Sequence, residues 1–200
     1  MKSIPWQATL ALAAATSLAL GACRLPQESP TPRYWMLTPI EGSASDGPVK
    51  RTVGVGPMEL PAYLDRAAVV TRAGPRLQVA PFDLWGQPLA ENVTAVVGLN
   101  LEHLVPGTSV ELFPWNVASR ELDQRVTVQF ARFEADSDGV VHLDASWELS
   151  GSTTSKLLAS GRTAIREPVA QDQGIEGVTL AMSRALAQLS RDIAAHLGSP

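Results

Sequence analysis

The amino-acid sequence predicts an α+β fold: a single domain with a mostly antiparallel or mixed sheet and two main helices packed on one face. Apolar residues recur at helical spacing over residues 89–104 and again over 175–197. Strand-like segments make up much of the remaining chain, and residues 141–149 alternate apolar and polar side chains without a break. Runs of strands combined with separate helices are typical of α+β domains.

Residues 1–22 have the three parts of a secretory signal peptide. Lys2 and the amino terminus supply a short positive end, and an uncharged apolar run follows over residues 8–20. The small residues Gly21 and Ala22 then precede Cys23, the only cysteine of the chain. This arrangement predicts export and cleavage before Cys23.

The sequence Leu20-Gly21-Ala22-Cys23 resembles a bacterial lipobox, in which the cysteine receives a diacylglycerol before cleavage. An ordinary cleavage site with a chance cysteine, or an uncleaved membrane anchor, is the alternative. The apolar run is shorter than the roughly 20 residues that a spanning helix needs. A triacylated Cys23 would stay in the membrane, since a single acyl chain binds only reversibly. Arg24 follows the cysteine where an aspartate would favour inner-membrane retention, so resemblance to enterobacterial sorting predicts the periplasmic face of the outer membrane.

Residues 23–32 are predicted to be a flexible tether, and residues 33–200 the folded domain. The tether carries Pro26, Pro30 and Pro32 among polar residues, so it cannot bury enough apolar surface to fold. The first strand is expected at 34–37.

Four further strands and the first helix are expected between residues 51 and 113. A loop rich in Gly, Ser and Asp should connect the first strand to a second strand at 51–56, which Pro57 is expected to stop. A third strand at 67–72 turns through Gly74 and Pro75 into a short strand at 76–79. The helix at 89–104 ends before Pro106-Gly107, and a short strand at 109–113 follows.

The second half of the chain is expected to form three strands and the last helix. Residues 125–133 place apolar side chains on one face until the phase slips at 131–133, which predicts a bulge. Asp138-Gly139 is a hairpin turn between this strand and the strand at 141–149. A weaker strand runs from 157 to 165, and the helix at 175–197 closes the domain.

Composition excludes several classes of function. Lys2 is the only charged side chain of the signal, so the 178 residues from Cys23 onward carry 15 basic and 20 acidic residues and a net charge of −5. Such a chain has neither the basic surface that binds nucleic acid nor a polybasic stripe for anionic lipid. With Cys23 lipidated, no thiol remains for a disulfide, a metal site or a nucleophile.

The chemistry-bearing residues do not form a recognisable catalytic motif. His103, His142 and His196 lie far apart in the sequence and outside metal-binding spacings, so we expect no metal or other cofactor beyond the lipid on Cys23. No Gly-x-Ser-x-Gly elbow is present. The glycines at 54 and 56 are followed by Pro57, which removes an amide donor, so they are better interpreted as a kinked strand than as a phosphate loop.

Three segments resemble the PqiC family of auxiliary lipoproteins of ABC-type transporters. They are Glu59-Leu60-Pro61-Ala62-Tyr63-Leu64-Asp65-Arg66, Phe82-Asp83-Leu84-Trp85-Gly86-Gln87-Pro88-Leu89 and Leu186-Ala187-Gln188-Leu189-Ser190-Arg191-Asp192-Ile193-Ala194. Gly86-Gln87 stands where the family usually has Ala-Glu, so any role of that glutamate is lost or is taken over by an amide.

The resemblance implies a non-enzymatic role in PqiABC-type systems that transport lipids or maintain membrane integrity. In these systems an inner-membrane component and a periplasmic tube of MCE domains work with an outer-membrane lipoprotein. The lipoprotein would form a ring of identical subunits and dock onto the tube. Two other hypotheses remain open: a stand-alone periplasmic module that holds lipid or another ligand between sheet and helices, and an envelope hydrolase.

Tyr63, Leu64, Asp65, Arg66 and Trp85 are the candidate interface residues. Tyrosine and arginine are enriched at protein interfaces, which favours a contact with another subunit or with the tube. The alternative is local: Asp65 and Arg66 cap or pair within the fold, Tyr63 packs, and Trp85 anchors the core.

Overall fold

The structure is a computed structural model that describes residues 30–42, 47–115, 122–151 and 155–197. Pro32–Pro200 form one compact unit and Met1–Thr31 another, of which only residues 30 and 31 are described. The predicted signal peptide, Cys23 and most of the tether therefore lie outside the described residues. None of the helices in the described ranges is long and apolar enough to cross a membrane.

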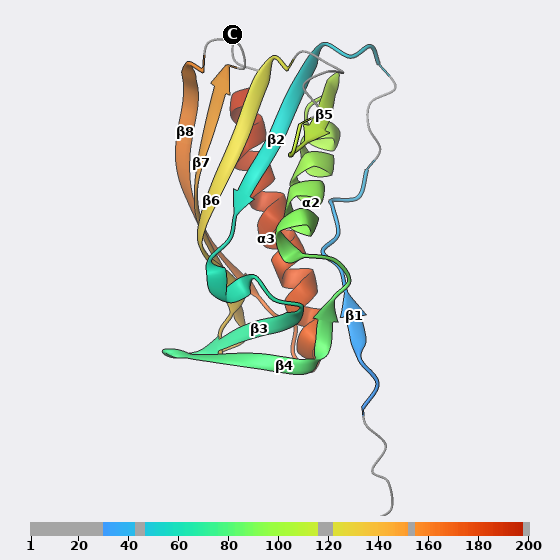
Figure 1. Cartoon of the computed structure of the whole chain (residues 1–200), viewed down its shortest axis with the longest axis vertical. Coiled ribbons are helices and arrows are strands. Elements are labelled where there is room, and N and C mark those ends of the chain that lie inside the picture. The colour runs from blue at the N-terminus through green and yellow to red at the C-terminus, as the bar shows by residue number, and fades with distance from the viewer. Residues whose placement is uncertain (1–29, 43–46, 116–121, 152–154, 198–200) are drawn as a thin grey trace, which may run out of the picture. The chain divides into compact units, whose positions relative to one another are not determined.

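A five-stranded mixed sheet and two helices form the larger part of the unit (Figure 1). The strand order is β5-β2-β6-β7-β8, with β2 parallel to both neighbours and β6, β7 and β8 antiparallel. The elements are β2 (Arg51–Glu59), α2 (Leu89–Leu104), β5 (Thr108–Leu112), β6 (Gln124–Ala135), β7 (Val140–Gly151), β8 (Leu157–Pro168) and α3 (Gly174–Leu197). Both helices lie on one face of this sheet (Figure 1), and the predicted α+β class is confirmed.

A second sheet of three strands was not expected from the sequence. It has the order β1-β4-β3, formed by β1 (Arg33–Trp35), β3 (Ala68–Ala73) and β4 (Arg76–Trp85). The sequence predicts only residues 76–79 of β4, whereas the strand continues through Pro81, which cannot donate a ladder hydrogen bond, to Trp85. The register between β3 and β4 shifts from Leu84 to Val79, so Pro81 lies where β4 makes no regular pairs with β3.

The expectation that Pro57 stops the second strand is wrong. β2 continues to Glu59, and its register with β6 shifts between Val55 and Met58. This irregularity accommodates the missing amide of Pro57, as bulges commonly do. The predicted kink is present: Gly56 has φ +111°, and a Cβ there would lie 2.8 Å from Cβ of Phe113.

The core between sheet and helices follows the predicted apolar patterns. Every apolar residue of the alternating strand faces inward: Val141, Leu143, Ala145, Trp147 and Leu149. The bulge in β6 is also present, as a register shift between Phe130 and Arg132. From α3 the buried stripe consists of Val178, Met182, Ala185, Leu186, Leu189, Ile193 and Leu197.

Candidate functional site: the 61–66 turn

The 61–66 turn connects the end of β2 to β3 through a short 3-10 helix, η1 (Ala62–Leu64). Its backbone is closed by hydrogen bonds from Leu64 N to Pro61 O (2.9 Å), Asp65 N to Ala62 O (3.2 Å) and Arg66 N to Leu64 O (2.8 Å). Leu64 is 3% exposed and lies in the core, whereas Asp65 and Arg66 are exposed. The turn therefore has a buried anchor and presents two opposite charges to solvent.

Tyr63 is fixed by a buried carboxylate. Its hydroxyl donates to Oε2 of Glu134, 2.7 Å away, and the backbone N–H of Phe133 donates to the same oxygen at 3.1 Å. The other oxygen, Oε1, accepts from Nε of Arg72 at 2.7 Å and from Nε of Arg132 at 2.8 Å. Glu134 has no exposed surface, and its two oxygens thus receive four donors from η1, β3 and β6.

The charge of Glu134 is stabilised by these donors despite its burial. Burial raises the pKa of a carboxyl, but the hydrogen bonds from Tyr63, Arg132 and Arg72 outweigh it and hold the pKa of Glu134 below its ordinary value. Burial, followed by the hydrogen bond to Glu134, raises the pKa of Tyr63. The guanidinium of Arg72 also lies over the Tyr63 ring, 5.2 Å from its centroid. Glu134 is thus ionised at neutral pH and joins the 61–66 turn to both sheets.

The predicted interface residues fall into two groups. The Tyr63 hydroxyl donates to Glu134, Leu64 is buried, and Trp85 is 6% exposed within the core. Asp65 and Arg66 are exposed and are the members of the set available for a polar contact with another molecule.

The segment 37–40, which follows β1, is tied to both helices by polar side chains that the sequence analysis did not identify. Leu37 N donates to Oδ1 of Asn92 (2.7 Å), Thr38 N to Oγ of Ser183 (3.1 Å) and Ile40 N to Oδ1 of Asn100 (2.8 Å). Asn92 and Asn100 are 4% and 0% exposed. Two asparagines within the apolar stripe of a helix were the available signal, since buried amides need partners.

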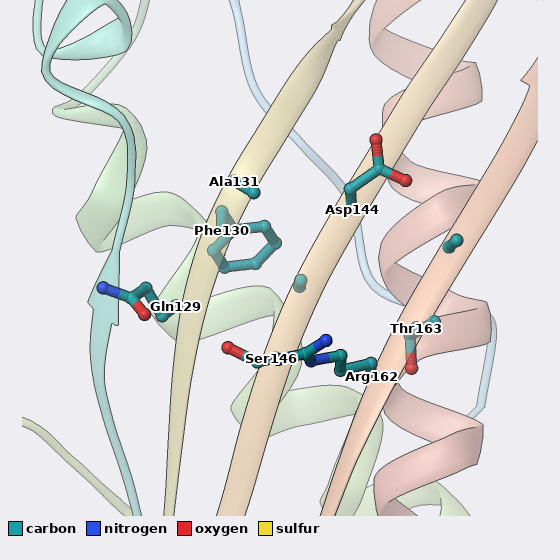
Figure 2. Close-up of a pocket in the computed structure, with 9 residues that line it drawn as sticks. Gln129, Phe130, Ala131, Asp144, Ser146, Arg162 and Thr163 are labelled. Carbon is teal, nitrogen blue, oxygen red and sulfur yellow. The ribbon is translucent and has the colours of Figure 1, made fainter.

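Two hollows of more than 500 Å³ open on the described surface of the unit. One, of about 580 Å³, lies on the sheet and is lined by residues of β6, β7 and β8. Figure 2 shows Gln129, Ser146 and Arg162 along this face. The other, of about 620 Å³, lies between α2 and β5, where Leu112 and Phe113 are 43% and 47% exposed.

The histidines have local partners instead of forming a shared centre. His103 Nδ1 lies 3.2 Å from Ile40 O, and His196 Nδ1 lies 3.0 Å from Asp192 O. His142 Nε2 pairs with Oδ2 of Asp136 at 2.5 Å, beside the β6–β7 turn. Within the described ranges, no group of three or more His, Cys, Asp or Glu residues could hold a metal ion.

The family of the chain follows from its sequence as a whole. A family model described as "ABC-type transport auxiliary lipoprotein component" matches residues 34–194. The chain belongs to this family. The resemblance to PqiC-type proteins is thereby confirmed, and this auxiliary lipoprotein is a component of ABC-type transport.

Solved structures agree on the fold of the auxiliary lipoprotein. An uncharacterized protein is 23% identical, with 84% of this chain and all of that chain covered at a TM-score of 0.66. A protein from Xanthomonas campestris is 18% identical, with 82% of this chain and 90% of that chain covered at a TM-score of 0.58. No curated protein matches the chain.

Proposed function

We propose that this auxiliary lipoprotein is the outer-membrane, periplasm-facing subunit of an MCE-type, PqiABC-like lipid transport system. The match of residues 34–194 to the auxiliary family carries the proposal. In it, lipid on Cys23 holds the protein in the membrane, and the folded unit docks onto the periplasmic tube as part of a ring of identical subunits. The protein stabilises the machine and turns over no substrate.

The 61–66 turn supports a docking role because its charged residues are presented on a fixed base. Asp65 and Arg66 follow directly after Leu64, which is buried, and Tyr63, which is bonded to Glu134. A pre-ordered backbone loses little conformational freedom on binding, which favours affinity. Opposite charges side by side also discriminate between partners, since a mismatched charge at an interface is costly.

The carboxyls with shifted pKa values support a structural function instead of catalysis. Burial opposes the charge of Glu134, Asp83 and Asp136, yet hydrogen bonds lower the pKa of each. Asp83 accepts hydrogen bonds from Nη2 of Arg33 and Nε1 of Trp35, both at 2.9 Å. Asp136 accepts hydrogen bonds from the backbone amides of Asp138 and Val140 and pairs with His142. A general base must instead have a pKa near the working pH and reach its substrate.

Crosslinking of the full-length lipidated protein tests the proposal. The protein is purified in mild detergent from its own envelope, crosslinked and analysed by mass spectrometry. We expect links to an MCE-domain protein that include residues of the 61–66 turn. Links among copies of this chain alone would refute membership of the transport machine.

A pair of charge reversals tests the turn itself. Arg66→Glu should reduce the links to the partner about tenfold, a loss typical of one unfavourable charge at an interface. Arg191→Glu, which reverses another exposed arginine on α3, is the matched control and should leave the links unchanged. Equal yields from both variants would place the docking surface elsewhere on the unit.

The alternative, a stand-alone lipid carrier, is favoured by one observation, the groove between α2 and β5. The interface of sheet and helices is filled by buried side chains such as Val55, Val93 and Leu186, so an acyl chain would have to lie in this groove instead. Native mass spectrometry of the folded unit would reveal a retained lipid. Its absence would count against the carrier hypothesis.

A further inference from the structure

The outer face of the three-stranded sheet carries a cluster of apolar side chains. Phe82 and Leu84 alternate along β4 with Asp83 and Trp85, which are each only 6% exposed and face inward. Leu84 pairs with Tyr34 of β1 on one side and with Ala68 of β3 on the other. The Tyr34 face, as we name it, consists of Tyr34, Met36, Ala68, Phe82 and Leu84.

The large side chains of the Tyr34 face are open to solvent. Tyr34 is 67% exposed, Met36 44% and Phe82 39%. Met36 continues the face beyond β1 and lies against Gly86, where a Cβ would come within 2.9 Å of its sulfur. Apolar side chains scattered singly over a surface are ordinary, but a contiguous group marks a surface that another molecule or a membrane covers.

The sheet beneath the Tyr34 face is held in place. Asp83 accepts hydrogen bonds from Arg33 and Trp35, the two neighbours of Tyr34 on β1, and Gly86 N donates to Trp35 O at 2.9 Å. Tyr34 therefore projects from a strand whose flanking side chains are tied down on the opposite side.

The position of the face in the chain identifies its occupant. Arg33 lies ten positions after Cys23, so the chain can span at most about 36 Å between them, and about 31 Å if the prolines make it a polyproline II helix. Tyr34 is the next residue. β1 starts at the same end of the unit as β3 and β4 (Figure 1), so the end of the unit nearest the anchor along the chain also carries the Tyr34 face.

The chemistry of the face suits the interfacial layer of a bilayer. Tyrosine is enriched there because its ring is apolar and its hydroxyl can remain hydrated, and phenylalanine, leucine and methionine insert more deeply. The neighbouring Arg33 is paired with Asp83 at 2.8 Å. The face would therefore contact lipid through its apolar side chains and not through unpaired positive charges. Apolar contact of this kind should depend little on lipid charge or on salt.

We propose that the Tyr34 face rests in the interfacial layer of the membrane that holds the lipidated Cys23, which orients the unit on that membrane. The inference rests on the anchor in the proposed function but not on any MCE partner. The lipid chains keep the protein at the surface, and the face determines which side of the unit meets the lipid.

Lipid quenching of a fluorescent label tests the proposal in the full-length lipidated protein. Because Cys23 is blocked by lipid, Phe82→Cys and Leu158→Cys each introduce a single reactive thiol. Leu158 is the matched control, since it is 48% exposed and lies at the start of β8, at the end of the five-stranded sheet away from β3 and β4 (Figure 1). Each protein is labelled with a bimane dye and placed in phosphatidylcholine nanodiscs that contain phosphatidylcholine with a doxyl group near the headgroup. Intact mass first verifies that Cys23 is lipidated.

We expect quenching at position 82 to exceed that at position 158 by about threefold or more, because interfacial insertion brings the label within a few ångströms of the quencher. The excess should persist in high salt. Equal quenching at the two positions would overturn the proposal. A label at position 82 that lipid does not quench, and that only a partner protein shields from solvent, would overturn it as well. A failure of the transport assignment would appear separately, as missing crosslinks to an MCE-domain protein.

Discussion

At the scale of single residues, Glu134 determines how the 61–66 turn is held. Glu134→Gln removes the negative charge but keeps the shape of the side chain. Arg72 and Arg132 then lose their common negative partner, and the new amide nitrogen, itself a donor, faces hydrogen-bond donors. The expected loss in the free energy of unfolding is about 3 kcal/mol, typical of breaking a buried charged network. Urea unfolding followed by circular dichroism measures it. A loss below about 1 kcal/mol would show that water replaces the lost contacts.

Tyr63→Phe isolates one contact of this network. The variant keeps the ring under Arg72 but removes the donor to Oε2 of Glu134, which still accepts from Phe133 N. We expect a loss of about 1–2 kcal/mol in unfolding free energy, as for a hydrogen bond to a charged group. Tyr34→Phe, which removes a hydroxyl from a 67% exposed ring, is the control and should change it by less than about 0.5 kcal/mol.

Sequence reasoning found one end of this network and missed the other. Tyr63 lies in a segment that resembles the family, whereas Glu134 lies in no motif and just beyond the strand predicted at 125–133. The phase slip at 131–133 predicts the bulge, but it does not predict that Phe133, Glu134 and Ala135 are all buried after it. Arg72 is 62 residues from Glu134 in the chain, so only tertiary structure brings them together.

At the scale of elements, β8 packs on β7 through a glycine opposite a tryptophan. Gly161 pairs with Trp147, and a Cβ on Gly161 would lie 2.5 Å from Cζ2 of that ring. The ring is 4% exposed and bonded to Thr163, so it cannot move aside freely. Gly161→Ala should therefore cost about 2–3 kcal/mol of unfolding free energy through overpacking.

Thermal and urea unfolding would measure the effect of Gly161→Ala, with Ser160→Ala as control. Ser160 is the exposed neighbour on the same strand, and its substitution should change stability by less than about 0.5 kcal/mol. Similar losses of unfolding free energy in the two variants would indicate that β8 is sensitive to any substitution, and that no specific clash with Trp147 occurs.

The 37–40 segment gives a second prediction at this scale. Asn92→Ala leaves the buried N–H and C=O of Leu37 without their side-chain partner, at an expected cost of about 1–3 kcal/mol. Hydrogen exchange at residues 37–40 should accelerate more than exchange in β7. Glu91→Ala, which changes an exposed neighbour on α2, should leave hydrogen exchange unchanged both at residues 37–40 and in β7. Unaltered exchange at Leu37 in Asn92→Ala would show that neighbouring contacts suffice.

The elements themselves were predicted unevenly, for physical reasons. Helix α2 and the alternating strand β7 were recognised because one period dominates each segment. The predicted second strand is shorter than β2 because Pro57 is expected to stop it, and a register irregularity at Val55/Met58 accommodates this proline. Strand β4 extends beyond the predicted residues 76–79, and its pairing with β3 shifts between Ala68 and Val70. Such irregularities depend on the partner strand, which a single sequence does not reveal.

At the scale of the whole molecule, the carboxylates of Asp83 and Glu134 connect parts of the chain that are distant in sequence, and that of Asp136 closes a local turn. Asp83 ties β4 to β1, Glu134 ties β6 to β3 and η1, and Asp136 closes the β6–β7 turn with His142. Glu134 thus joins the two sheets through an ionised group, in addition to their common apolar core. The protein has no thiol besides Cys23 to staple these parts, so their connection depends on charge and packing.

These carboxylates predict how stability depends on pH. In the folded chain the pKa of each lies below the ordinary value, which is 4.5 for Glu134 and 3.8 for Asp83 and Asp136. The unfolded chain therefore takes up protons first as the pH falls, so the stabilisation is complete at neutral pH and is lost progressively below about pH 5. Urea unfolding at pH 7, 5, 4 and 3 should show a nearly constant contribution down to pH 5 and then a steep decline. Glu134→Gln should begin from a lower stability but decline less steeply, because one proton uptake is removed. Parallel pH profiles for the two proteins would mean that Glu134 has the same pKa in the folded and the unfolded chain, so that its hydrogen bonds do not favour the ionised form.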